Sequence, residues 1–79
     1  MRVLIVDDSA FARERIVQLT TAAGHEAFQA SCGQEALRLI SEIRPDAVTV
    51  DLLMPGMDGI ELIEKLHAAY PSLPVIVVS

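Results

Sequence analysis

Residues 48–59 read Val48-Thr49-Val50-Asp51-Leu52-Leu53-Met54-Pro55-Gly56-Met57-Asp58-Gly59. A β-branched, apolar run ends here on one carboxylate, Asp51, and a turn built from one proline and two glycines follows it. A strand of this kind carries a charged group out of the core to one edge of a sheet. In open α/β sheets, ligands bind at the carboxyl ends of the strands. The stretch therefore predicts a functional carboxylate at such an edge.

Short apolar runs alternate with helical patterns on both sides of this stretch. The apolar runs predict strands over residues 2–6, 26–30, 47–51 and 75–79, and helical patterns fill the three intervals between them. Alternation with short connections indicates a parallel sheet with helices on its faces. We expect one α/β domain over residues 1–79, a flavodoxin-like three-layer sandwich with the partial strand order 2-1-3-4.

Apolar spacing also predicts which side of a helix packs against the sheet. In the helix after the first strand, this side consists of Ala12, Ile16, Leu19 and Ala23. In the helix after residue 59, it consists of Ile60, Ile63, Leu66 and Tyr70.

Composition narrows the classes of function. The formal net charge is −5 with a single lysine, so the chain has no basic cluster for nucleic acid. No signal peptide and no apolar run of 18 residues occur, which argues against a membrane protein. The hydrophobic content of 52% is sufficient for an aliphatic core. We expect a cytoplasmic domain.

Two further acids, Asp7 and Asp8, directly follow the first strand. The expected strand order places that strand beside the one that ends at Asp51, so three carboxylates meet. Without a cation they would repel one another, and Mg²⁺ relieves such repulsion because it prefers oxygen ligands. A carboxylate can also act as a nucleophile and form an aspartyl phosphate, with Ser79 offering a hydroxyl to a phosphoryl oxygen. The plainer alternative is that Asp8 only caps the following helix.

Three segments together resemble the receiver domain of bacterial response regulators in two-component systems: residues 4–9 (LIVDDS), 51–59 (DLLMPGMDG) and 77–79 (VVS). The resemblance covers all 79 residues. It implies that Asp51 accepts a phosphoryl group from the phosphohistidine of a histidine kinase. It also implies that Asp8, Asp51 and the backbone carbonyl of Leu53 bind Mg²⁺ or Mn²⁺. Asp7 would act through water, and Ser79 would be the switch hydroxyl.

The resemblance ends with the fourth strand. The family's fourth helix, fifth strand and fifth helix have no counterpart in residues 1–79, and the lysine that contacts the phosphoryl group is therefore missing. Lys65 does not replace it, because it falls in the third helix. We expect weak phosphorylation and an open sheet edge along residues 75–78. Such an edge favours self-association or a domain-swapped dimer over a compact monomer.

Two alternatives belong to other classes of function. The first is an assembly module derived from a receiver, which associates through its open sheet edge without being phosphorylated. The second is an enzyme, an aspartate-nucleophile phosphatase, which requires an acid two residues after the nucleophile. Leu53 occupies that position, so we expect a phosphoacceptor protein and not an enzyme.

Overall fold

Four strands form one parallel sheet whose order is β2-β1-β3-β4. The computed structural model describes residues 1–52 and 59–78. The strands are β1 (Arg2–Val6), β2 (Glu26–Ala30), β3 (Ala47–Asp51) and β4 (Val75–Val78). The helices are α1 (Ala10–Ala22), α2 (Gly33–Ile43) and α3 (Gly59–Ala69). Strand order and pairing confirm the predicted flavodoxin-like arrangement.

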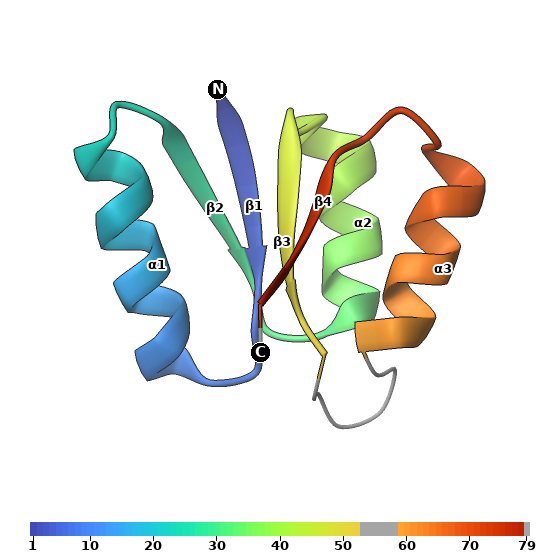
Figure 1. The fold of residues 1–79 in the computed structure, drawn as a ribbon, viewed down its shortest axis with the longest axis horizontal. Coiled ribbons are helices and arrows are strands. Elements are labelled where there is room, and N and C mark those ends of the chain that lie inside the picture. Colours follow the sequence, from blue (N-terminus) through green and yellow to red (C-terminus); the bar gives the residue numbers. More distant parts are fainter. Residues whose placement is uncertain (53–58, 79) are drawn as a thin grey trace.

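The helices cover the two faces of the sheet unequally. Helix α1 lies on one side, and α2 and α3 lie together on the other (Figure 1). A right-handed crossover between parallel strands places a helix on one face, and reversing the direction of travel along the sheet moves the next helix to the opposite face. The chain moves outward from β1 to β2 and then returns past β1 to β3. The single helix on one face follows from this order.

The core lies between the sheet and the pair α2 and α3. In the register of the sheet, Leu4 is opposite Val48 and Val6 is opposite Val50, and each of the four is at most 1% exposed. The helices contribute buried side chains to the same cluster: Ala36, Ile40, Leu62 and Leu66. Full burial of one Val or Leu side chain stabilises a fold by about 1.5–3 kcal/mol. This aliphatic layer fixes the two central strands against each other.

The predicted side of helix α1 is correct in part, because Ala12 and Ile16 are partly buried as expected. Leu19 is 71% exposed, and Ala23 beyond the helix end is also exposed. From Ala12 and Ile16 the partly buried row continues to Thr20, at intervals of four residues, and not to Leu19. Apolar side chains occur around the whole circumference of α1, since Phe11 is also 74% exposed. Periodicity alone could not choose between these sides.

The predicted side of α3 is correct in part. Leu66 is buried and Ile63 packs against the core, as expected. Ile60 is 58% exposed, however, and Tyr70 lies beyond the end of the helix. Leu62, one turn before Leu66, occupies the buried position instead.

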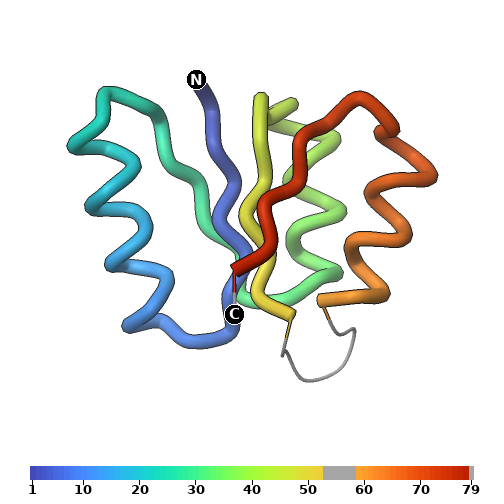
Figure 2. The backbone as a smooth tube through the Cα atoms, viewed as in Figure 1, coloured from blue at the N-terminus to red at the C-terminus, as the bar shows by residue number. Residues whose placement is uncertain are grey.

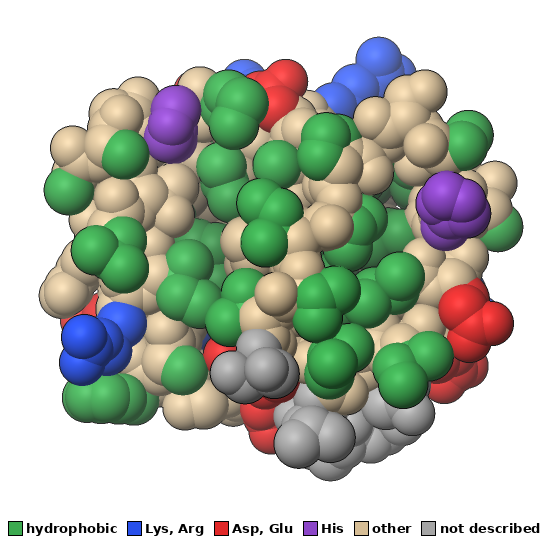
Figure 3. Space-filling model, in the orientation of Figure 1, with side chains coloured by type: hydrophobic (Ala, Val, Ile, Leu, Met, Phe, Trp, Pro, Cys, Tyr) green, Lys and Arg blue, Asp and Glu red, His purple; other side chains and the backbone are tan. Residues whose placement is uncertain are grey.

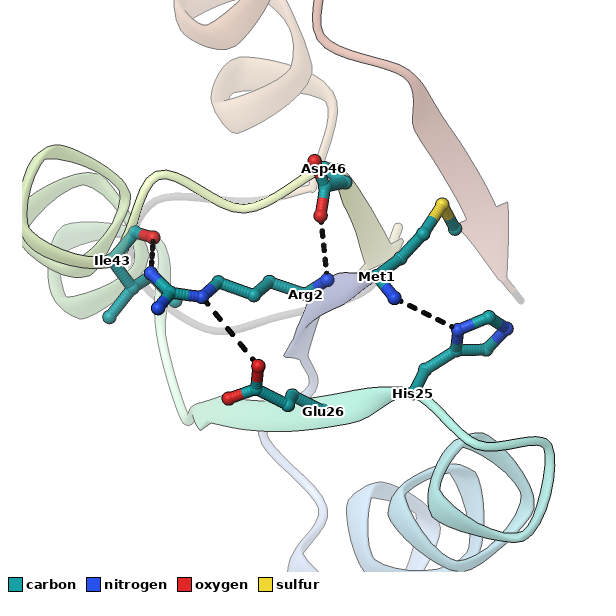
Figure 4. A network of polar contacts seen from close by, with 6 residues as sticks. All are labelled: Met1, Arg2, His25, Glu26, Ile43 and Asp46. Atoms are coloured by element: carbon teal, nitrogen blue, oxygen red, sulfur yellow. Dashed lines mark hydrogen bonds and ion pairs between the residues drawn. The ribbon is translucent and has the colours of Figure 1, made fainter.

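Polar contacts hold the amino-terminal edge of the sheet (Figure 4). The Arg2 backbone N–H donates to a carboxylate oxygen of Asp46 at 2.7 Å, and its Nη1 donates to the carbonyl oxygen of Ile43 at 2.8 Å. Its Nε lies 3.8 Å from Glu26 Oε1. These contacts join β1 to β2 and to the α2–β3 connection, at the edge opposite the acids.

Strand β4 is at one end of the observed strand order. Its side chains Ile76 and Val77 are 53% and 50% exposed, and hydrophobic side chains gather over the middle of the face where β4 lies in front (Figure 3). Self-association through this edge stays a prediction. Within the described residues, the helices are too short or too polar to cross a bilayer.

Candidate functional site

Strands β1 and β3 end side by side at the carboxyl edge of the sheet (Figure 2). Three carboxylates meet at this edge. The two strands pair in parallel up to Val6 and Val50. The next residue of each chain segment, Asp7 and Asp51, therefore lies at this edge, and Asp8 follows in the turn before α1. One carboxylate oxygen from each acid lies within 4.8 Å of the other two.

Asp7 is the most buried of the three acids. It is 6% exposed, and its backbone N–H donates to the carbonyl oxygen of Ala30 at 3.1 Å, which extends the pairing of β1 with β2. Its Oδ1 accepts a hydrogen bond from the backbone N–H of Ser9 at 2.9 Å. Ser9 in turn caps α1, because its hydroxyl accepts from the N–H of Ala12. The start of α1 and the position of Asp7 thus depend on one short turn.

The surroundings of Asp7 make its negative charge costly. Burial raises the pKa of Asp7 above its ordinary value, and the hydrogen bond from Ser9 opposes that rise. The nearby carboxylates of Asp51 and Asp8 raise the pKa of Asp7 further. A positive charge placed among the three acids would therefore stabilise the ionised form of Asp7.

The donor set suits a small, hard cation. Mg²⁺ binds oxygen ligands at about 2.0–2.1 Å, so ligands on opposite sides of the ion are about 4.2 Å apart. The carboxylate oxygens already lie within 4.8 Å of one another, which leaves only small side-chain movements to complete such a site. Asp8 is exposed and can make this adjustment, whereas Asp7 is buried. The acids therefore fit the Mg²⁺ that the sequence predicts.

Gly59 brings the start of α3 against the end of β3. Its N–H donates to the carbonyl oxygen of Leu52 at 3.1 Å. A Cβ at this position would lie 2.5 Å from the Cα of Leu52 and still closer to the carbonyl oxygen of Asp51. The sequence places Gly59 in the turn, but only the structure gives the reason for a glycine, which is the close approach of two backbones.

Two predicted site groups lie outside the described residues. They are the backbone carbonyl of Leu53 and the hydroxyl of Ser79, and their proposed roles stay predictions. Most of the turn that the sequence predicts, residues 55–58 of 55–59, also lies outside the described residues. Lys65 lies on α3 and is exposed, in the element where the sequence places it.

Sequence reasoning missed the side chain of Arg13. Its guanidinium reaches back from α1 to the carbonyl oxygen of Asp7 and also contacts Gln29 on β2. The sequence did contain an indication of this contact, because Arg13 stands next to Ala12 on the side of α1 that packs against the sheet. A charged residue on a packing side requires a polar partner.

Comparison with known proteins identifies the family of this chain. A family model described as the response regulator receiver domain matches residues 3–79. The chain is 44% identical over 79 residues to the chemotaxis protein CheY of Thermotoga maritima, covering 99% of this chain and 66% of that protein. It is 48% identical over 82 residues to a protein-glutamate methylesterase/protein-glutamine glutaminase of Bacillus licheniformis, covering 100% of this chain and 22% of that protein. The chain thus spans less than two thirds of the length of these relatives.

Solved structures agree with this assignment. The N-terminal domain of a response regulator receiver protein from Methanoculleus marisnigri matches with a TM-score of 0.93 at 29% identity, covering 99% of this chain and 65% of that one. The receiver domain of NtrX from Brucella abortus matches with a TM-score of 0.92 at 30% identity, covering 95% and 64%. With the family match and the shared fold, this chain belongs to the response regulator receiver domains of two-component systems.

Proposed function

We propose that the chain is a phosphoacceptor in which Asp51 receives a phosphoryl group from the phosphohistidine of a histidine kinase. The observation that carries this proposal is the meeting of Asp7, Asp8 and Asp51 within 4.8 Å at the carboxyl edge of the sheet. Membership of the receiver family supports it. Asp51 is the acid on the central strand β3, and it is only partly buried, so a phosphodonor can approach it.

The transfer requires one bond to form and one to break. A carboxylate oxygen of Asp51 attacks the phosphorus atom, and the bond from phosphorus to the imidazole nitrogen breaks. That nitrogen keeps the electron pair and takes up a proton from solvent. The products are an aspartyl phosphate and a neutral histidine, so no further reactant is needed.

The remaining groups of the site position the phosphoryl group and neutralise the negative charge on its oxygens. Bound Mg²⁺ would supply positive charge against the phosphoryl oxygens, which is the main requirement of phosphoryl transfer. Asp8, Asp51 and the carbonyl of Leu53 would hold the ion directly, and Asp7 would hold it through water. The hydroxyl of Ser79 would donate a hydrogen bond to a phosphoryl oxygen.

A small phosphodonor tests this proposal without the kinase. The protein is incubated with acetyl phosphate and Mg²⁺, and its intact mass is measured. We expect a mass increase of one phosphoryl group in the wild type and in Asp46→Asn, whose side chain lies at the opposite edge of the sheet. Asp51→Asn should show no increase. An equal adduct on Asp51→Asn would contradict the proposal, because the phosphoryl group would then be elsewhere.

The assembly-module alternative is not favoured. The family match is to a receiver domain, and the described acids of the site are all in place. Histidine kinases are the partners of receiver domains in two-component systems, so a kinase is the proposed partner here. The position of β4 at one end of the described strand order does not by itself favour assembly over phosphoryl acceptance.

A further inference from the structure

We infer that Arg13 is a positioning residue that sets the geometry of the acidic site, an inference that rests on the proposed function. Its Nη1 donates to the backbone carbonyl oxygen of Asp7 at 2.7 Å, in a partly buried contact. Its Nε donates to Oε1 of Gln29 at 3.1 Å. One planar group thus joins α1, β2 and the turn that carries two acids.

The first contact gives a hydrogen-bond donor to the Asp7 carbonyl, for which no strand partner is found among residues 1–52 and 59–78. The N–H of Asp7 still pairs with Ala30 on β2, but β1 ends at Val6, so ladder pairing ends near this point. Hydrogen bonds from a guanidinium are charge-assisted and stronger than neutral ones. Arg13 therefore donates a hydrogen bond to the backbone at the point where the pairing of β1 with its neighbours ends.

This carbonyl belongs to the peptide unit that links Asp7 to Asp8. The unit is planar, so fixing the carbonyl oxygen also fixes the direction of the Asp8 N–H and the position of its Cα. Asp8 is exposed, so the protein packing around it does little to hold it in place. Arg13 determines from which direction the Asp8 carboxylate meets those of Asp7 and Asp51.

The second contact gives the guanidinium a fixed direction. Gln29 lies on β2 opposite Ile5 of β1, directly before the residue that pairs with the Asp7 N–H. Its amide oxygen accepts from Nε, which limits rotation about the end of the Arg13 side chain. A lysine could keep the charge but could not make two hydrogen bonds in fixed directions. Substitution can therefore separate the effect of the positive charge at residue 13 from the effect of its two directed hydrogen bonds.

Mn²⁺ provides the probe, because its free form is measured directly by electron paramagnetic resonance. The metal is titrated into the wild type, Arg13→Gln, Arg13→Lys and Gln29→Met, with thermal melting of each variant as the folding control. Arg15→Gln is the matched control, since it removes the same charge from the exposed side of the same helix. Loss of outer-shell partners weakens metal binding about 10–100-fold.

We expect Arg13→Gln and Arg13→Lys to raise the Kd for Mn²⁺ about tenfold, at the lower end of that range. Gln29→Met should raise the Kd by a smaller factor, and Arg15→Gln should leave it near the wild-type value. A wild-type Kd in Arg13→Lys, or equal effects of Arg15→Gln and Arg13→Gln, would show that charge alone matters and would overturn the inference.

The outcomes also separate this inference from the proposed function. Metal binding by the wild type with an unchanged Kd in Arg13→Gln overturns the role of Arg13 alone. A wild type that binds no Mn²⁺ overturns the proposed metal site, and the role of Arg13 with it. If Arg13→Gln melts below the assay temperature, the Kd of Gln29→Met for Mn²⁺ is used in its place. An unchanged Kd in Gln29→Met then overturns the inference.

Discussion

Asp7 shows at the residue scale how much of the site depends on contacts that a sequence does not display. Two apolar runs that end in acids are enough to predict that Asp7, Asp8 and Asp51 meet. The sequence could not indicate that Asp7 is buried, or that Arg13 reaches its carbonyl oxygen. Long side chains adopt many rotamers, and the surrounding tertiary packing selects among them.

The raised pKa of Asp7 predicts a pH effect on the stability of the metal-free protein. The folded-state pKa lies above the ordinary value of 3.8, so the folded protein binds more protons than the unfolded one in the window above pH 3.8. The free energy of unfolding therefore falls as the pH rises through that window. Asp7→Asn lacks this titration, while its amide oxygen can still accept from Ser9.

Urea unfolding without metal at a series of pH values measures this effect. At pH 7 Asp7→Asn should be more stable than the wild type, and the advantage should shrink as the pH falls to 3.8. A wild type that gains stability relative to Asp7→Asn as the pH rises would refute the prediction.

Thr49 offers a second prediction at the same scale. The residue is 9% exposed, and its Oγ1 has no hydrogen-bond partner in the described part of the chain. A buried hydroxyl without a partner carries a desolvation cost, so Thr49→Val should raise the free energy of unfolding by about 1 kcal/mol. Thr20→Val is the control, because the Thr20 hydroxyl donates to Ile16 at 2.7 Å. Chemical denaturation that shows a loss for Thr49→Val would contradict this account.

The elements themselves are largely predictable, but their orientation is not. All four strands occur where the apolar runs predict them, with residue 79 outside the described part. The predicted side of α1 is correct at Ala12 and Ile16 but not at Leu19, which is apolar and yet exposed, as Phe11 is. Hydrophobic spacing locates a helix, whereas the packing side of a helix with apolar residues all round depends on its tertiary neighbours.

Gly59 leads to a prediction at the scale of elements, because it sets the distance between β3 and α3. In Gly59→Ala the added methyl would collide with the backbone of Asp51 and Leu52. We expect a loss of about 1–3 kcal/mol in stability, together with weaker metal binding, since the end of β3 must shift.

Gly24→Ala is the comparison for Gly59→Ala. Gly24 has a φ of +89°, but no atom lies within 4 Å of the position that an added methyl would occupy. Only backbone strain is therefore added there, about 1–2 kcal/mol. Denaturation and Mn²⁺ titration of both variants separate the two effects. An unchanged metal affinity in Gly59→Ala, with the protein folded, would show that the approach of α3 does not position Asp51.

At the scale of the whole molecule, the strand order does most to create the site. β1 and β3 are far apart in the sequence and adjacent in the sheet, so their acids converge at one edge, while α2 and α3 bury the core behind them. The alternating pattern is sufficient to predict this topology. The sequence also predicts an open sheet edge along residues 75–78, and Ile76 and Val77 on β4 are 53% and 50% exposed.

A cation bound among the acids should stabilise the whole fold. A ligand that binds only the folded state raises stability by about 2.7 kcal/mol when its concentration is about 100 times the Kd. Mg²⁺ should therefore raise the melting temperature of the wild type and of Glu14→Gln, whose side chain is exposed on α1. The shift should be lost in Asp8→Asn. Equal shifts in Asp8→Asn and the wild type would place the bound ion elsewhere.

The most direct test of the central claim is to locate the phosphoryl group in the protein. After incubation with acetyl phosphate, the protein is digested at low pH and its peptides are sequenced by tandem mass spectrometry, with Mg²⁺ present or removed by a chelator. We predict that the phosphoryl group is found on Asp51 and that its yield falls sharply without Mg²⁺. A phosphoryl group on another residue, or the same yield on Asp51 with and without the metal, would contradict the claim that these three acids form one metal-assisted phosphoacceptor site.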